Sequence, residues 1–211
     1  MSEITAVLGG SFDPVHLGHI DIARQLLARF DFKELLLVPA YRNPLKPGTH
    51  ASTDDRIKLL ELALGEANEP RLKVYDWEAR RAAPSFTVDT LEQLQKTHGQ
   101  LALAVGNEVF AQFTKWRAPL KIFSLANVVV FSRTPDVQNP CEEVLESLGI
   151  TVAWEENRAE LPDGNWIEWV PLTVLPYSST EIRSQLLEGK TPAGLGSAPL
   201  RFIKDQGLYA E

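Results

Sequence analysis

The stretch VLGGSFDPVHLGHI, residues 7–20, joins a short apolar run to a segment with helical periodicity. The run ITAVL (4–8) is continuous and rich in β-branched residues, which predicts a buried strand that stops at Gly9 and Gly10. Residues 17–29 repeat apolar side chains along one helical stripe, made of Ile20, Ala23, Leu26 and Leu27. The stretch therefore predicts a strand, a glycine-containing turn and a helix, in the order typical of an α/β protein.

The same alternation continues along the chain. Further apolar runs predict strands at 34–39, 72–76, 101–106, 128–131 and 167–174. Helices are predicted from a cap at Thr53 or Asp54, and at 87–96, 108–125, 141–148, 179–188 and 199–205, with a loop in the rest of the polar segment 134–165. Because these strands are too apolar to have a face in water, the pattern predicts one α/β domain over residues 1–211. We expect a single Rossmann-like, doubly wound parallel sheet with helices on both faces and a short C-terminal helical part.

Composition narrows the class of function. The net charge is −7 and basic residues form no block, so broad binding of nucleic acid is not expected. The single Cys141 excludes an intramolecular disulfide and a thiolate metal site. No apolar run approaches the ~20 residues of a membrane span, and no basic segment followed by a long apolar one precedes residue 4. The default expectation is a cytoplasmic protein without a membrane segment.

The turn after the first predicted strand carries groups that suit an anion. Ligands of open α/β sheets lie beyond the carboxyl ends of the strands, and a helix N-terminus favours negative charge. Gly9 and Gly10 let backbone amides approach a ligand, although the stretch matches neither a Walker loop nor G-x-G-x-x-G. His16 and His19 are three residues apart and project from the same face of the first helical turn, with Gly18 keeping the space between them open.

Two interpretations of this histidine pair compete. One histidine could cap the helix while the other packs in the core. The other interpretation is that both donate to a phosphate whose charge grows during a reaction. The composition of the chain predicts only roughly 0.005 chance matches to H-x-G-H. Together with its place after the first strand, this rarity favours the functional interpretation.

With these residues, the chain resembles the nucleotidyltransferase superfamily that carries H-x-G-H and S-S-T-x-I-R motifs. The second motif is present in YSSTEIR (177–183), at the start of a predicted helix. Further blocks resemble the bacterial nicotinate-mononucleotide adenylyltransferases in order and spacing: VPAYRNPLK (38–46), DDRIKLLELAL (54–64), PSFTVDTLEQL (84–94), AVGNEVFAQFTKW (104–116) and FIKDQGLY (202–209). This resemblance implies transfer of an adenylyl group from ATP to nicotinate mononucleotide, giving deamido-NAD and pyrophosphate in NAD biosynthesis.

The resemblance also implies roles for individual residues. Three of them, His16, His19 and Arg183, would be catalytic and hold the ATP phosphates. The rest of the ATP site would comprise Gly9, Gly10, Ser11, Phe12, Gly18, Gly106, Asn107, Ser178, Ser179 and Thr180. The acceptor site would comprise Lys46, Ser85, Thr87 and Trp116, whose indole could stack on a pyridine ring. On their own, Trp116 would more often be a core or surface aromatic, Ser178 to Thr180 a helix cap, and Lys46 a solvated charge.

Three positions depart from the family pattern. Asn107 stands where an aspartate is usual, NPLK (43–46) replaces P-P-H-K, and the strand after Trp116 ends in FSRT (131–134) rather than R-P-G. The alternatives are therefore an adenylyltransferase that prefers nicotinamide mononucleotide or another phosphate acceptor, and a non-catalytic nucleotide-binding module. Such a module would be expected to lose His16 or His19, and both are present. The sequence also leaves the oligomeric state open, with a homo-oligomer as one alternative.

The predicted mechanism needs little covalent chemistry. The acceptor's phosphate oxygen attacks the α-phosphorus of ATP in line, without a general base and without a covalent intermediate. Catalysis then depends on positioning and on charge stabilisation. Mg²⁺ is expected to arrive with the ATP phosphates, because no cluster of carboxylates in the sequence predicts a dedicated metal site.

Overall fold

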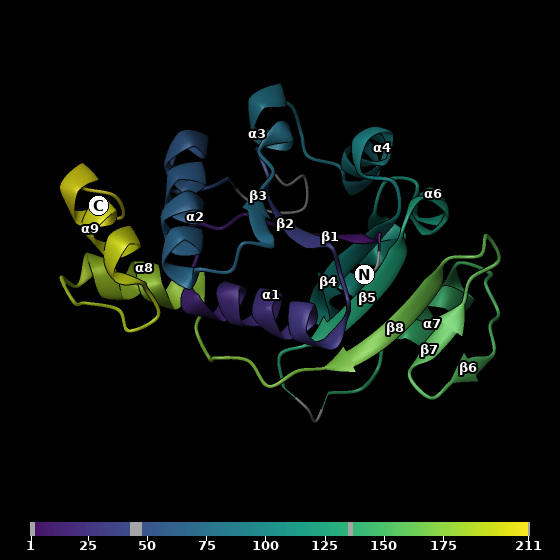
Figure 1. The fold of residues 1–211 in the computed structure, drawn as a ribbon. Coiled ribbons are helices and arrows are strands. Elements are labelled where there is room, and N and C mark those ends of the chain that lie inside the picture. The colour runs from purple at the N-terminus through teal and green to yellow at the C-terminus, as the bar shows by residue number, and fades with distance from the viewer. Residues whose placement is uncertain (1–2, 43–47, 135–136, 211) are drawn as a thin grey trace. The chain divides into compact units, whose positions relative to one another are not determined.

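The structure is a computed structural model that describes residues 3–42, 48–134 and 137–210 (Figure 1). The chain folds into two compact units, each built from segments that are far apart in the sequence. Unit 1 contains the described residues of Met1–Gly9, Asp31–Glu34 and Phe86–Thr173. Unit 2 contains those of Gly10–Phe30, Leu35–Ser85 and Val174–Glu211. The expectation of one domain over residues 1–211 stays a prediction.

Unit 1 is organised around a mainly parallel sheet. Its parallel strands lie in the order β1 (Thr5–Gly10), β4 (Leu101–Gly106), β5 (Asn127–Ser132) and β8 (Trp166–Pro171). The register aligns Val7 with Leu103, Leu103 with Val128 and Val128 with Ile167. All six residues of β5 are buried, as expected for a central strand covered on both faces. The predicted α/β fold with a parallel sheet is confirmed.

The antiparallel edge of this sheet was not predicted. The strands β7 (Arg158–Glu160) and β6 (Trp154–Glu155) extend the sheet beyond β8, within the segment predicted to be a loop. They are short and mostly exposed, so their sequence lacks the apolar signal of a strand. Arg158 fixes the pairing by an ion pair with Glu168 (Nε to Oε2, 2.9 Å) and lies over the Trp166 ring at 4.0 Å. The predicted helix of this segment is present as α7 (Cys141–Ser147).

The helical stretch predicted at 108–125 is broken into three pieces. These are α5 (Asn107–Phe110), the 3-10 helix η1 (Phe113–Lys115) and α6 (Pro119–Leu125). Ala118 has a left-handed backbone (φ 51°) that no continuous helix accommodates, and Pro119 then starts α6. The pieces remain together because Phe113 contacts the rings of Phe110, Trp116 and Phe123 at centroid distances of 4.9, 5.0 and 5.0 Å. Among its described residues, unit 1 also contains the helix α4 (Thr87–His98).

Unit 2 combines a parallel strand pair with five helices among its described residues. The strand β2 (Glu34–Pro39) pairs with β3 (Leu72–Val74), and the helices are α1 (Leu17–Arg29), α2 (Thr53–Ala67), α3 (Trp77–Arg81), α8 (Ser179–Leu187) and α9 (Ser197–Gln206). The apolar stripe predicted on α1 is buried. The predicted cap of α2 is wrong by one or two residues, because Ser52 accepts the hydrogen bond from the Asp55 N–H at 3.1 Å.

The helices α2 and α9 lie side by side within unit 2 (Figure 1). Glu66 of α2 caps the start of α9, because its Oε1 accepts hydrogen bonds from the Ser197 hydroxyl and, at 2.7 Å, from the Ala198 N–H. A Cβ at Gly196 would lie 1.9 Å from Oε2 of Glu66, so a larger residue there would displace this carboxylate from its capping position. The carboxylate therefore satisfies one of the N–H groups that a helix start leaves without an intrahelical partner. No helix in the described parts of the chain is long and apolar enough to cross a membrane.

Candidate functional site

The turn between β1 and α1 is held by an aromatic contact. Phe12 has a left-handed backbone (φ 48°), which is unfavourable for a residue with a Cβ, yet its side chain is buried. Its ring covers Gly10, where a Cβ would lie 2.9 Å from the ring. Gly10 is thus required for packing within the turn. At Gly9, by contrast, a Cβ would meet no atom of the described residues within 4 Å.

The two histidines lie together at the start of α1. The rings of His16 and His19 stack with centroids 3.7 Å apart and an interplanar angle of 31°. Phe12 contacts His19 edge-on at 5.0 Å, and the backbone N–H of His16 donates to Nδ1 of His19 at 3.2 Å. His16 is buried, whereas His19 is half-buried. The two rings lie against each other, but His16 precedes the first turn: it is the N-cap residue of α1, with an extended backbone (φ −143°). His16 and His19 form a capping box, so the interpretation that a histidine caps the helix also holds.

This hydrogen bond determines where the proton of a neutral His19 lies. Nδ1 accepts the His16 N–H, so Nδ1 itself carries no proton. The proton of the neutral ring is then on Nε2. His19 is thereby oriented as an Nε2–H donor, the chemical property that a site for a developing phosphate charge needs.

Gly18 has a different role from the predicted one. The prediction was that Gly18 leaves an open space between the histidines. The structure instead fills this space, because a Cβ on Gly18 would lie 3.0 Å from Nδ1 of His16 and 3.0 Å from the carbonyl oxygen of Leu175. The chain at Leu175 is itself tied to α1, since its N–H donates to the Asp21 carboxylate at 3.0 Å. Gly18 therefore permits close packing of His16 against α1.

The second motif lies against the same turn, although 160 residues separate the two in the sequence. Ser178 caps α8 by accepting from the Glu181 N–H at 3.2 Å, as the alternative interpretation of this motif expected. The Ser179 hydroxyl donates to the carbonyl oxygen of Pro14 at 2.9 Å. Nη1 of Arg183 donates to the carbonyl oxygen of Asp13 at 2.6 Å, and Nη2 donates to the Thr180 hydroxyl at 3.4 Å. Within unit 2, the second motif thus contacts the turn that immediately precedes H-x-G-H.

Asp13 is the centre of this contact, and sequence reasoning assigned it no role. Its buried carboxylate accepts hydrogen bonds from the His50 N–H (2.7 Å) and Nδ1 (3.2 Å), the Ala51 N–H (3.0 Å) and the Tyr209 hydroxyl (2.9 Å). Burial would raise the pKa of Asp13, but these donors outweigh it and hold the pKa below its ordinary value. We call Asp13, His50, Ala51, Arg183 and Tyr209 the Asp13 network. The sequence offered one indication of this role: Asp13 lies in the stretch 7–20 that carries H-x-G-H, and Tyr209 ends the family block FIKDQGLY (202–209).

A buried arginine supports the same turn from α2. Arg56 is fully buried, and its Nη1 donates to the carbonyl oxygen of Ser11 at 2.7 Å. Its Nη2 donates to the Thr53 hydroxyl at 3.3 Å. Burial lowers the pKa of Arg56, while the negative charge of Asp13 opposes this change. This positive charge thus compensates the buried carboxylate, a second contribution that sequence reasoning missed.

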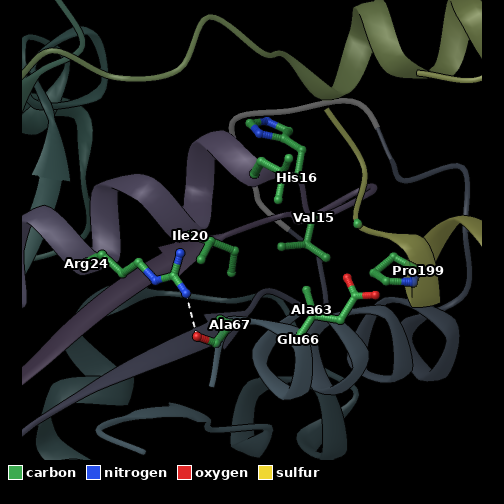
Figure 2. A pocket seen from close by; sticks show the side chains of 10 residues that line it. Val15, His16, Ile20, Arg24, Ala63, Glu66, Ala67 and Pro199 are labelled. Carbon is green, nitrogen blue, oxygen red and sulfur yellow. Dashed lines mark hydrogen bonds between the residues drawn. The ribbon is translucent and has the colours of Figure 1, made fainter. Parts of the chain in front are cut away.

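A small cavity lies next to the histidine turn. Its volume is about 90 Å³. Val15, His16 and Ile20 line it from the turn before α1 and from α1 itself, and Ala63 of α2 and Pro199 of α9 line it as well (Figure 2). Arg24, which also lines it, donates to the carbonyl oxygen of Ala67. Ligand pockets generally have about 300–1,000 Å³, so this cavity is too small to hold a nucleotide.

The predicted sugar and acceptor residues lie mainly in unit 1. Gly106 ends β4, and Asn107 begins the short helix α5 that follows it. Thr87 is the first residue of α4. Trp116 packs on Phe113, and its indole Nε1 is buried without a hydrogen-bond partner among the residues that the structure describes. Gly106 and Asn107 thus occupy the carboxyl end of a central strand, where open α/β sheets bind ligands.

Arg117 connects the Trp116 segment to the start of α4. Its guanidinium pairs with the Asp89 carboxylate and lies over the Phe86 ring at 4.1 Å. A helix start that holds an anion needs N–H donors and no uncompensated negative group nearby. Asp89 is a negative group in the first turn of α4, but Arg117 neutralises it. Neither residue was singled out from the sequence.

One predicted acceptor residue, Ser85, lies in the other unit, and a second falls outside the described residues. Ser85 belongs to unit 2, where its Oγ accepts from the Tyr41 N–H at 3.0 Å and its own N–H donates to the Arg42 carbonyl oxygen at 3.0 Å. Its hydroxyl therefore supports the chain before residue 43. Lys46 lies outside the described residues.

Within the described part of the chain, no group of three or more His, Cys, Asp and Glu side chains is arranged to hold a metal ion.

The chain is similar to known nucleotidyltransferases. The sequence pattern of the cytidylyltransferase-like family matches residues 7–185. A "probable nicotinate-nucleotide adenylyltransferase" of Aquifex aeolicus is 41% identical over 142 residues, which cover 66% of this chain and 83% of the relative. A protein of the same description from Chromohalobacter salexigens is 34% identical over 211 residues, which cover 97% of this chain and 95% of the relative.

A solved structure shares the fold. The "Plasmodium falciparum nicotinic acid mononucleotide adenylyltransferase complexed with NaAD" superposes with a TM-score of 0.74, at 15% identity, over 99% of this chain and 98% of that one. At this identity the likeness concerns the fold alone, and it confirms the predicted Rossmann-like architecture.

Proposed function

Because the chain belongs to the cytidylyltransferase-like family, and within it to the nicotinate-nucleotide adenylyltransferases, we propose that it transfers the adenylyl group of ATP to nicotinate mononucleotide. The products are deamido-NAD and pyrophosphate, and the reaction belongs to NAD biosynthesis. The observation that carries the proposal is the contact between the H-x-G-H turn and the S-S-T-x-I-R helix, made by Arg183 and Ser179 on Asp13 and Pro14. These contacts gather the phosphate-binding candidates in one unit.

In the proposed mechanism, the phosphate oxygen of the acceptor attacks the α-phosphorus of ATP in line, and pyrophosphate leaves. His16 and His19 donate to the phosphate charge that develops, with Nε2–H of His19 directed by its Nδ1 bond. Arg183 supplies a positive charge, and its two hydrogen bonds to described residues use two of its five N–H donors. An anionic phosphate needs no general base, so positioning and electrostatics supply the rate enhancement.

A covalent intermediate on cysteine is unsuited to this chain. Cys141 is fully buried, and burial raises the pKa of its thiol to about 12. At neutral pH it is therefore protonated and weakly nucleophilic. This observation supports direct transfer. Mg²⁺ is proposed to enter as part of the substrate, bound to the ATP phosphates, where it neutralises charge during the transfer.

We also propose a preference for the acid form of the acceptor. Nicotinate and nicotinamide mononucleotides differ in carboxylate against carboxamide on the ring. The start of α4 offers backbone N–H groups and the Thr87 hydroxyl, and Arg117 offsets the charge of Asp89 there. Trp116, supported by Phe113, is proposed to stack on the pyridine ring. These features favour a carboxylate over a neutral amide.

The test uses the purified chain with ATP and Mg²⁺. Pyrophosphate release is followed with nicotinate mononucleotide, with nicotinamide mononucleotide and without acceptor, and the dinucleotide product is identified by mass spectrometry. We expect release that depends on the acceptor and is faster with the acid. Faster release with the amide would support the alternative that the chain is an adenylyltransferase that prefers nicotinamide mononucleotide. No release with either acceptor would contradict the proposed function and would favour a binding module or another phosphate acceptor.

A further inference from the structure

We propose that Asp13 and Tyr209 are positioning residues, and that Tyr209 affects ATP binding and turnover through Arg183. The inference rests on the proposed function, in which Arg183 holds the ATP phosphates. It assigns a role to the chain after α9, which contains no predicted site residue.

Tyr209 and Arg183 hold opposite ends of the same residue. The Tyr209 hydroxyl donates to Oδ1 of Asp13 at 2.9 Å, and Nη1 of Arg183 donates to the carbonyl oxygen of Asp13 at 2.6 Å. Tyr209 is 8% exposed and Asp13 is 5% exposed, so water competes little for either bond. A displacement of Asp13 therefore moves the acceptor to which the guanidinium is bound.

The Asp13 carboxylate is charged and needs all its donors. It is buried, and its partners are two backbone N–H groups, the exposed His50 ring and the Tyr209 hydroxyl. Removing one donor from a buried charged group leaves that group under-bonded, and the surrounding structure must move or admit water. Tyr209 shares Oδ1 with the Ala51 N–H, so this second bond reports any displacement.

The Asp13 network also orients the guanidinium of Arg183. One nitrogen is bound to the Asp13 carbonyl oxygen and the other to the Thr180 hydroxyl, so both ends of the planar fork are fixed. Pre-organised donors lose little entropy when they bind a phosphate, and small misplacements reduce rates strongly. Within the described residues, the Tyr209 hydroxyl is hydrogen-bonded to Asp13, and Asp13 in turn holds Arg183, so Asp13 links the two side chains.

The experiment removes only the hydroxyl, with Tyr209→Phe. We expect kcat/KM for ATP to fall about tenfold, and the affinity for α,β-methylene-ATP, measured by calorimetry, to fall in the same direction. Amide hydrogen exchange at His50 and Ala51 should become faster. Tyr75→Phe is the matched control, since Tyr75 lies in the same unit outside the Asp13 network, and it should change none of the three readouts.

A double-mutant cycle separates positioning from general loss of structure. If Tyr209 acts through Arg183, Tyr209→Phe should change analogue binding by less than twofold in an Arg183→Lys background. Equal losses in both backgrounds, or unchanged binding and turnover in Tyr209→Phe, would overturn the inference. Folding is checked by circular dichroism. If Tyr209→Phe does not fold, His50→Ala removes the milder side-chain contact and should produce a smaller loss of the same sign.

The analogue and exchange measurements need no acceptor. An inactive wild-type chain that binds α,β-methylene-ATP would therefore contradict the proposed function and still test the positioning role. An active wild type whose binding is unaffected by Tyr209→Phe would contradict the positioning role alone.

Discussion

Gly18→Ala should lower the catalytic activity while leaving the free energy of unfolding nearly unchanged. A Cβ at residue 18 would lie 3.0 Å from Nδ1 of His16 and 3.0 Å from the carbonyl oxygen of Leu175, roughly 0.5 Å inside the ordinary contact of ~3.5–4.0 Å. Because the Leu175 backbone is tied to Asp21, the His16 ring is the group that must move. Alanine favours a helix over glycine by up to about 1 kcal/mol, which offsets part of the steric cost.

We therefore expect the free energy of unfolding of Gly18→Ala to change by less than ~1 kcal/mol while kcat falls on the order of 10–10²-fold. The assays are thermal unfolding and pyrophosphate release with ATP and nicotinate mononucleotide. Gly65→Ala is the matched control. It is also a helical glycine, but its Cβ would meet no described atom within 4 Å, so it should be stabilised and fully active. Full turnover by folded Gly18→Ala would refute the role assigned to the His16 ring.

Three further predictions address the remaining site residues. His19→Ala should lower kcat on the order of 10²–10³-fold with the fold retained, because one donor to the developing charge is lost; near-normal turnover of the folded variant would contradict its assignment. Asn107→Asp should be tolerated and should change KM more than kcat if the side chain meets sugar hydroxyls, so complete loss of activity would exclude that role. Trp116→Ala should lower kcat/KM for nicotinate mononucleotide and for nicotinamide mononucleotide by the same amount, equivalent to ~1–3 kcal/mol, and a change confined to one of them would argue against ring stacking.

The fold was predictable where structure follows from local pattern. The strands Glu34–Pro39 and Leu101–Gly106 and the helix Leu17–Arg29 occur at the predicted residues, because apolar runs and helical stripes record burial directly. The break at Ala118 was missed, although Pro119 in the predicted helix 108–125 signals a boundary at the preceding residue; the left-handed backbone of Ala118 itself has no sequence signal. Nor was the pairing of β7 with β8, which depends on a partner strand rather than on the sequence of β7 itself.

The site was predictable to the extent that it consists of motifs. The contact between His16 and His19 and the capping by Ser178 follow from motifs that place a residue at a helix N-cap and another three positions later. The Asp13 network did not follow, because two donors to its carboxylate are backbone N–H groups and a third is a tyrosine near residue 210. Hydrogen bonds to the backbone impose no residue pattern, and the packing that joins α9 to the turn is purely tertiary.

The capped start of α9 has a consequence for chain length. Glu66 fixes the first turn of α9, and Tyr209, just after the end of this ten-residue helix, is bound to Asp13. Each residue of an α-helix contributes a rotation of about 100° and a rise of ~1.5 Å. Deleting or inserting a single residue within α9 would consequently turn Tyr209 away from Asp13, although every residue of the Asp13 network would still be present. Helix length at this place is as much a determinant of the site as residue identity.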